Sequence, residues 1–264
     1  MSVPAAQFFS DYANHRAAEG RGYRGAALHA LPYLKTGPFA KQWAVRARSF
    51  DVFAKHVVAP MARTLGRPLN ILDLGAGNGW LSNRVARMGH KAVALDIRND
   101  TVDGLGVATE FLRDTANLFE CVNASFDDMP LGPARFDITI FNASLHYAQN
   151  LSRALREATR VTKRDGAIIV LDSPFYAHDE DGVAMVAEKH AQGHTTFGAH
   201  ADVLLGQNFI EYLTYEKLRA ASTCLIWSRR RVLYPLWYEM RPLLARLKGK
   251  RAPSRFDLWM ALVP

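Results

Sequence analysis

Between residues 68 and 174, short apolar runs alternate with stretches of helical periodicity. Apolar residues spaced three or four apart fall on one face of a helix, so helices are predicted at 79–88, 101–117 and 151–162. Strands that are apolar on both faces and alternate with helices are typical of a parallel sheet covered on both sides. The apolar runs predict five such strands, at residues 68–74, 91–97, 119–124, 136–141 and 167–171.

The segments on either side of this pattern differ from it. Residues 1–66 are predicted to form a helical N-terminal cap, and residues 67–264 form the main domain. Residues 175–211 are rich in His and Gly and too long for an ordinary connection, which favours an irregular lid. Toward the C-terminus we expect a helix at 215–221, strands at 223–227 and 256–263, and a basic insertion at 229–255.

Composition narrows the class of protein. With 49% hydrophobic and 22% charged residues, the 264-residue chain is an ordinary globular sequence and not a disordered or fibrous one. No apolar run approaches the roughly 18 residues of a membrane span. The N-terminus lacks the basic and apolar regions of a signal peptide. Cys121 and Cys224 form neither a disulfide framework nor a metal cluster, so we expect free thiols in a cytoplasmic protein.

Positive charge is concentrated at the two ends of the chain. The net charge is +8, and residues 1–72 and 229–264 each carry +7, so the centre is mildly acidic. The basic insertion interleaves its arginines and lysines with Tyr234, Trp237 and Tyr238. Such a segment can bind RNA through phosphates and stacking, lie on an anionic membrane, or form a solvated helix packed on the sheet edge. The sequence leaves these alternatives open.

A glycine-rich turn ends the first predicted strand and reads DLGAGNG from Asp73 to Gly79. Glycines there allow the backbone to approach a ligand and to turn into a helix whose N-terminal N–H groups face it. The carboxylate of Asp73 can face a cationic amine of a ligand, directly or through water. Asp96 ends the second strand, where a carboxylate can accept hydrogen bonds from both hydroxyls of a ribose. The turn alone is unspecific, because other nucleotide-binding folds use a similar one.

Together, these segments resemble the class I S-adenosylmethionine-dependent methyltransferases with a methyltransferase-11-like domain. The resemblance covers about residues 69–174 and the terminal strands, and rests on ILDLGAGNGWLS, ALDI, FDITIFNASLHY and RVTKRDGAIIVLD. It implies a Rossmann-like α/β fold whose seven-stranded, mostly parallel sheet has the order 3-2-1-4-5-7-6, with strand seven antiparallel. It also implies S-adenosyl-L-methionine as the cofactor.

The resemblance assigns roles to individual residues as well. It places the methionine part of the cofactor at Asp73 and the glycine turn, and the ribose at Asp96. Where Ser125 stands, many relatives carry an Asp that accepts from the adenine amine; here the serine hydroxyl or Asp127 takes that place, and Phe126 either covers the adenine or belongs to the core. The residues expected to bind the cofactor are Asp73, Gly75, Ala76, Gly77, Gly79, Trp80, Asp96, Ile97, Ser125, Phe126 and Asn142.

Polar residues after the fourth strand are candidates for catalysis. In an open α/β sheet, ligands bind where the strand order reverses, here between strands one and four, so His146 should lie beside the transferred methyl. An imidazole titrates near neutral pH, which makes His146 the first candidate for a general base, with packing of the loop as the alternative. Tyr12 and His15 form a second catalytic cluster with Arg16, on a helix that either covers the cofactor or is solvated.

The spacing of the lid histidines does not match a metal-binding motif. His190 and His194 lie four residues apart, but the glutamate of an HExxH motif is missing, so no metal is expected. The sequence therefore predicts a cytoplasmic methyltransferase that acts on an oxygen or nitrogen of a small-molecule acceptor selected by the lid. The alternatives are a tRNA or rRNA methyltransferase and a non-catalytic interaction module that binds the cofactor.

Overall fold

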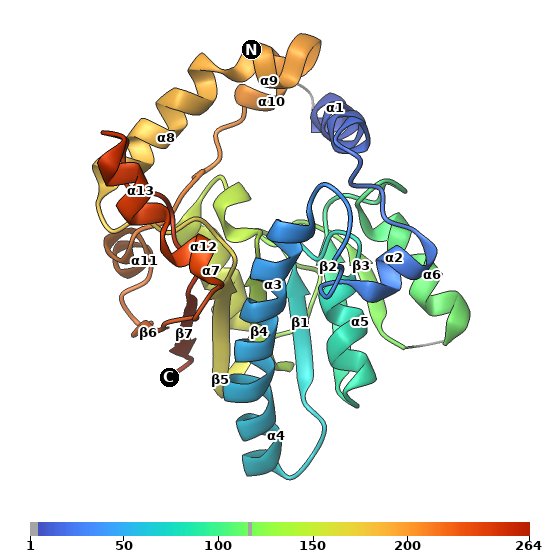
Figure 1. Ribbon diagram of the computed structural model, residues 1–264. Helices are drawn as coiled ribbons and strands as arrows, with labels where there is room; N and C mark the ends of the chain where they lie inside the picture. Colours follow the sequence, from blue (N-terminus) through green and yellow to red (C-terminus); the bar gives the residue numbers. More distant parts are fainter. Residues whose placement is uncertain (1–4, 116–117) are drawn as a thin grey trace.

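Seven strands form a single sheet in the order β3-β2-β1-β4-β5-β7-β6 in the computed structural model, which describes residues 5–115 and 118–264 (Figure 1). β7 runs antiparallel to both of its neighbours, β5 and β6, and the other neighbouring strands are parallel. The fold and strand order expected from the sequence are therefore confirmed. The strands are β1 (Asn70–Leu74), β2 (Lys91–Asp96), β3 (Glu120–Asn123), β4 (Phe136–Asn142), β5 (Thr162–Leu171), β6 (Ser228–Arg230) and β7 (Leu258–Leu262).

One face of the sheet is crossed by a long rod of helix from the N-terminal region (Figure 1). Phe50, Phe53 and Val57 of this rod are buried in the same core cluster as Ile71 of β1 and Leu81. The N-terminal region therefore supplies part of the layer that covers the sheet. The rod consists of α3 (Ala40–Phe53), a π-helical segment (Ala54–Val58) and α4 (Ala59–Leu65), and α2 (Gly25–Ala30), α5 (Trp80–Arg87) and α6 (Leu105–Asp114) share its face.

The opposite face is covered by α7 (Leu151–Val161) and α11 (Tyr215–Ala221). Leu155 of α7 and Leu218 of α11 are buried in one cluster with Phe141 of β4. The apolar residues of α7 recur at helical spacing, so a full face of this helix is buried. As a result, the helix after β1 and the helix after β4 lie on opposite faces of the sheet.

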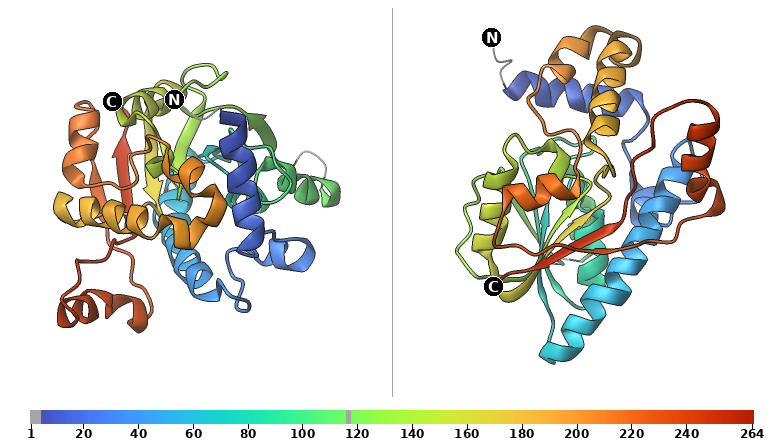
Figure 2. Two further views of the ribbon diagram at one scale, coloured as in Figure 1. Left: turned by 90° about the horizontal axis from the view of Figure 1, so that it is seen from above. Right: turned by 90° about the vertical axis from the view of Figure 1, so that its left-hand side faces the viewer.

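The lid lies above the carboxyl ends of the strands, together with α1 (Ala5–Ala18), as Figure 2 shows. The expectation of an irregular lid is wrong, because residues 175–211 are largely helical. Acidic residues occupy the first turn of the longest lid helix, where carboxylates interact favourably with the helix dipole. The glycines that suggested a loop only divide the segment into short helices: α8 (Asp179–Ala191), α9 (Gly193–Phe197) and α10 (Ala201–Leu205).

The strand predicted at 223–227 is also wrong, since β6 begins at Ser228. β6 is an edge strand that pairs only with β7, and its side chains are exposed, so no apolar pattern marks it. The basic insertion that follows contains α12 (Leu236–Glu239) and α13 (Arg241–Leu247). Two parts of the expected helices, residues 1–4 and 116–117, lie outside the described residues.

A buried carboxylate ties three strands together. Asp137 of β4 accepts hydrogen bonds from Arg67, from the backbone N–H of Asn70 in β1 and from Lys163 in β5, each at 2.8 Å. Burial by itself raises the pKa of Asp137, but these donors outweigh it and hold the pKa well below its ordinary value. The ionised carboxylate therefore stabilises the folded sheet.

Replacing Asp137 with Asn should lower the free energy of unfolding at neutral pH by about 1.5–3 kcal/mol, the usual range for hydrogen bonds to a charged group. Because folding depresses this pKa, the stabilisation is present above the unfolded value of about 3.9 and is lost as the pH falls below it. Urea unfolding of both proteins at neutral pH and in acid measures this difference. Asp202→Asn, whose side chain is 91% exposed, is the control. A difference that does not shrink in acid would contradict the assignment.

Candidate active site

The turn after β1 passes close to the loop after β4. Gly75 has a φ of +71°, in the left-handed region that favours glycine. A Cβ atom at this position would lie 2.4 Å from the Cβ of Ser144. The hydroxyl of Ser144 also donates a hydrogen bond to the carbonyl of Leu74. Only glycine therefore allows the two loops to meet without displacing one of them.

Asp96, at the end of β2, accepts a hydrogen bond on each carboxylate oxygen. The backbone N–H of Gly77 donates to Oδ2 at 2.7 Å, and that of Arg98 donates to Oδ1 at 2.8 Å. Burial raises the pKa of Asp96, and the two N–H groups act against this rise. Each oxygen keeps a lone pair for a ligand hydroxyl. This geometry fits the ribose role expected from the sequence.

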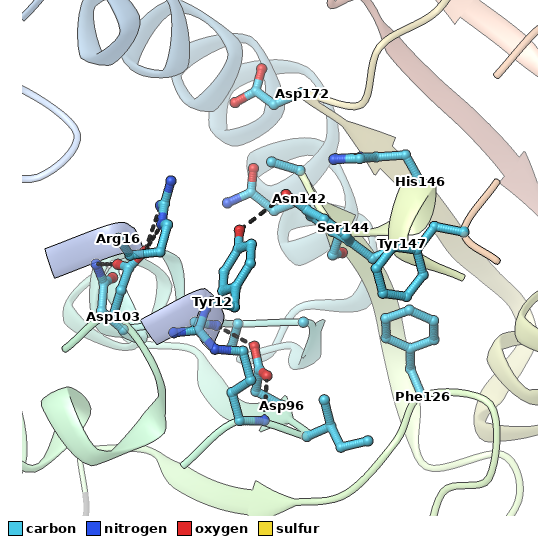
Figure 3. Close-up of a pocket in the computed structure, with 18 of the residues that line it drawn as sticks. Tyr12, Arg16, Asp96, Asp103, Phe126, Asn142, Ser144, His146, Tyr147 and Asp172 are labelled. Atoms are coloured by element: carbon cyan, nitrogen blue, oxygen red, sulfur yellow. Dashed lines mark hydrogen bonds and ion pairs between the residues drawn. The ribbon is translucent and has the colours of Figure 1, made fainter. Parts of the chain in front are cut away.

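These groups border a cavity of about 610 Å³ above the carboxyl ends of the central strands, a volume typical of small-molecule sites (Figure 3). α1 contributes Phe8, Phe9 and Tyr12 to the wall, and the segment after α10 contributes Gln207 and Phe209. Most of the residues expected to bind the cofactor are also on the wall. These are Gly75, Ala76, Gly77, Trp80, Asp96, Ile97, Ser125, Phe126 and Asn142.

The loop after β3 forms one side of the cavity. The hydroxyl of Ser125 accepts the backbone N–H of Asp127 at 3.2 Å, so it helps to shape the loop. The ring of Phe126 lies edge-on to Phe141, with centroids 5.5 Å apart. Oδ1 of Asp127 is buried and has no hydrogen-bond partner among the described residues. A ligand N–H donor would satisfy this oxygen, so Asp127 suits an adenine amine better than Ser125 does.

Asp73 and Gly79, expected at the methionine part of the cofactor, do not line the cavity. Asp73 is 1% exposed, and its Oδ2 accepts a hydrogen bond from Ser82 of α5 at 3.0 Å. Burial raises the pKa of Asp73 to about 7. A Cβ atom on Gly79 would lie 3.0 Å from the Cβ of Ala108. Both residues therefore act behind the wall, where they hold the turn against α5 and α6.

α1 is linked to the glycine turn by a chain of polar contacts. Nε of Arg16 donates to Oδ2 of Asp103 at 2.9 Å, and Nδ2 of Asn78 donates to Oδ1 of the same carboxylate at 3.0 Å. The hydroxyl of Tyr12 lies 3.1 Å from that of Tyr147, as the dashed line in Figure 3 marks. Tyr12 and Arg16 are both on the cavity wall. The helix predicted to cover the site does so.

His15 is not on the wall, although the sequence groups it with Tyr12 and Arg16. Its ring packs against Phe197 of the lid at 4.9 Å, and its Nε2 lies 3.8 Å from Glu19. Successive helical positions point in different directions, so neighbours in sequence do not share a face. The structure therefore separates His15 from Tyr12 and Arg16, and a catalytic role for His15 stays a prediction from the sequence.

His146 lies on the wall, in a short turn of helix after β4, and Figure 3 shows its ring directed into the cavity. Its Nδ1 is 3.4 Å from the hydroxyl of Ser173. Burial, followed by the charges of Arg46 and Lys189, lowers the pKa of His146 to about 3. The imidazole is therefore neutral at physiological pH. It can accept a proton, but it is a weaker base than a free histidine.

Two charged residues on the wall are not among the site residues expected from the sequence. Asp172 follows β5 and is 6% exposed, and neither of its oxygens has a hydrogen-bond partner among the described residues. Burial raises the pKa of Asp172, while Arg46 and Ser49 act against this. The Arg46 guanidinium lies over the ring of Trp43 at 5.1 Å and has no ion pair in the part of the chain that the structure describes. Both residues are available to a ligand.

The wall has three chemically distinct regions. Asp96, Asp127 and Phe126 suit a nucleoside, through hydroxyl and amine acceptors and an aromatic ring. Arg46, whose charge acts on both His146 and Asp172, can neutralise an anionic group of a ligand. His146 and Asp172 lie beyond the end of β4, where a second molecule would meet the first. No group of three or more residues that could hold a metal ion occurs among the described residues.

Comparison with known protein families identifies a methyltransferase domain in this chain. Residues 72–170 match the family model described as a methyltransferase domain. The malonyl-[acyl-carrier protein] O-methyltransferase of Halorhodospira halophila is 28% identical over 54% of this chain and 49% of its own length. The sarcosine/dimethylglycine N-methyltransferase of Halorhodospira halochloris is 30% identical over 46% of this chain and 43% of its own length. The matches thus span less than half of these relatives.

Solved structures extend the likeness to the whole fold. The geranyl diphosphate C-methyltransferase from Streptomyces coelicolor superposes with a TM-score of 0.61 over 99% of this chain and all of its own, at 12% identity. The 1,6-didemethyltoxoflavin-N1-methyltransferase from Burkholderia thailandensis gives 0.57 over 100% and 91%, at 19% identity. The sequence match over residues 72–170, the strand order and the site geometry all support a class I S-adenosylmethionine-dependent methyltransferase domain in this chain.

Proposed function

We propose that this protein binds S-adenosylmethionine in the cavity and transfers its methyl group to an oxygen or nitrogen of a small molecule. The observation that carries the proposal is the position of Asp96. Its carboxylate ends β2, borders the cavity and is held by the N–H of Gly77 in the glycine turn. A nucleoside ribose placed there brings the rest of the cofactor along the turn toward Asn142 and His146.

Closure of the cavity supports a small acceptor over a nucleic acid. Phe8 of α1 packs edge-on against Phe209 at 5.4 Å, and Phe209 packs against Tyr147 at 5.5 Å. Tyr147 in turn contacts Tyr12, with ring centroids 6.2 Å apart. These aromatic contacts join α1, the lid and the loop after β4 above the site. A base in a polynucleotide would have to displace them.

The cofactor supplies a methyl group that is already activated as a sulfonium. The tasks that remain for this chain are to align the acceptor and to exclude water, and both follow from the closed aromatic wall. Where the acceptor must lose a proton, His146 can take it through Nε2. Nδ1 then has to donate its hydrogen to Ser173, the hydroxyl that lies 3.4 Å away.

We assign Asp172 to the acceptor. A carboxylate that is buried without partners costs free energy, and a hydrogen-bond donor on the ligand would recover part of it. His146 lies on the same wall, and the charge of Arg46 acts on both residues, so His146 and Asp172 serve the same end of the cavity. The acceptor should therefore present an amine or hydroxyl to Asp172 in addition to the atom that is methylated.

Transfer of a labelled methyl group tests the proposed function. The protein is incubated with S-adenosylmethionine labelled on the methyl carbon and with either a small-molecule extract or purified RNA, with and without nuclease. Label in a small molecule, with a mass gain of one methylene, is the expected result. Label in RNA would establish the nucleic-acid alternative. Binding of the cofactor without transfer to any fraction would leave an interaction module.

Replacing Asp96 with Ala should weaken the binding of S-adenosylhomocysteine about 10- to 150-fold, because hydrogen bonds to a charged group are lost. Calorimetry measures the dissociation constant, and circular dichroism checks the fold. Asp128→Ala is the matched control, since that side chain is 83% exposed. Equal affinity in the Asp96 variant and its parent would remove Asp96 from the ribose role.

Replacing His146 with Ala should lower turnover about 10²- to 10⁴-fold and leave affinity for S-adenosylhomocysteine unchanged. With a pKa near 3, His146 stays neutral across the physiological range. The rate should therefore show no acid limb at the ordinary histidine pKa of about 6.5, contrary to the expectation from sequence. His56→Ala, on the exposed side of the long rod, is the control. A variant that keeps more than about a tenth of the activity would exclude a base role.

Replacing Asp172 with Asn should raise KM for the acceptor about tenfold or more, because the ligand loses a charged hydrogen-bond partner. The dissociation constant of S-adenosylhomocysteine should not change. Steady-state kinetics with the acceptor found by labelled transfer, together with calorimetry, separates the two effects. If both affinities fell together, Asp172 would serve the cofactor or the fold. Unchanged kinetics would show that it has no part in binding.

A further inference from the structure

The basic insertion projects from the body of the protein beside the lid (Figure 2). No residue of α13 is buried. Large apolar side chains are nevertheless concentrated there, with Leu236 76% and Leu247 74% exposed. So large a group of exposed apolar side chains is unusual, because most apolar side chains of a globular protein lie in its core. The set, called the apolar ridge below, comprises Leu233, Leu236, Trp237, Met240, Leu243, Leu244 and Leu247.

The apolar ridge follows the period of a helix. Met240, Leu243, Leu244 and Leu247 have the spacing i, i+3, i+4, i+7, which places them in one stripe along α13. Such a stripe on a soluble helix faces a core. Here the four side chains are 37–74% exposed, so none of them is buried against another element of the described residues.

Positive charge lies beside this stripe. Arg241, Arg246, Lys248 and Lys250, the basic flank, form no ion pair in the described part of the chain. Arg241 lies over the ring of Tyr238 at 4.6 Å, and the other three side chains are exposed. An apolar stripe flanked by unpaired cations is typical of helices that lie in the interface of an anionic membrane.

Of the three aromatic residues that could stack on the bases of an RNA, Trp237 alone is exposed, at 42%. Tyr234 and Tyr238 are buried, and both belong to the core cluster of the sheet face. Several arginines of the insertion are also already paired. Arg229 forms an ion pair with Asp257, and Arg255 pairs with both Asp257 and Glu239. What remains exposed is mostly leucine, which interacts with acyl chains and not with bases.

We propose that the apolar ridge and the basic flank bind the surface of an anionic membrane. α13 would lie in the plane of the interface, with the ridge among the acyl chains and the flank at the phosphates. Attachment would be peripheral, because none of the helices in the described ranges is long and apolar enough to span a bilayer. The proposal does not depend on methyl transfer or on the identity of the acceptor.

Sedimentation of the full chain with vesicles tests the proposal. Vesicles of phosphatidylcholine alone are compared with equimolar phosphatidylcholine and phosphatidylglycerol, at low and at physiological salt. We expect binding to the anionic vesicles that weakens with salt. The double variant Leu243→Ser/Leu247→Ser should lose about tenfold or more in affinity, because two leucines no longer enter the acyl chains. Leu65→Ser, at the far end of α4 and 44% exposed, is the matched control.

The charges are tested separately. Arg246→Gln/Lys248→Gln should reduce binding and its salt dependence, whereas Lys55→Gln/Arg63→Gln on the long rod should not. All variants alter exposed side chains, so thermal unfolding should be unchanged. Vesicle binding that is equal in ridge variant and parent would overturn the proposal. So would salt-dependent binding of labelled single-stranded RNA without vesicle binding, or a dimer that the ridge variant abolishes.

Discussion

The site depends on a single feature of the sheet: the chain leaves β1 and β4 toward opposite faces. α5 packs on one face and α7 on the other, so the loops that precede them diverge and leave a crevice at the carboxyl ends of the strands. Gly75 then brings the turn after β1 back against Ser144. α1 lines the other side of this crevice, and the polar groups of the site are arranged around it.

Much of this arrangement could be predicted, because the glycine turn, Asp96 and His146 each lie at the end of a predicted strand or within five residues of it. A residue at the end of a parallel strand has its position fixed by the sheet. Arg46 and Asp172 were not predicted in this way. Arg46 lies on a helix that the sequence places in a separate cap, and nothing but its position among buried neighbours distinguishes it. Asp172 does follow a strand, and an unusual acidic residue after AIIVL was the signal that could have identified it.

Where the structure places a residue differently from the expectation, tertiary packing explains the difference. Asp73 belongs to the motif whose residues were expected to contact the cofactor. Its carboxylate instead accepts a hydrogen bond from Ser82 and does not line the cavity. His15 shares a helix with Tyr12, but only one side of that helix meets the cavity. β6 forms from exposed, charged residues because β7 offers a free edge, and not because of any apolar pattern. In each case, contacts with another element of the fold decide where the side chain or strand lies.

The long rod across the sheet has a consequence for where the chain can be shortened. α3 carries Trp43 and Arg46 on the cavity wall and Phe50 and Phe53 in the core. Because these side chains cover the sheet and line the cavity, we expect the rod to fold together with the sheet. Truncation at residue 67 would strip one face of the sheet, expose its apolar side chains to solvent and favour aggregation over folding. Any fusion or domain dissection must keep the rod with the sheet.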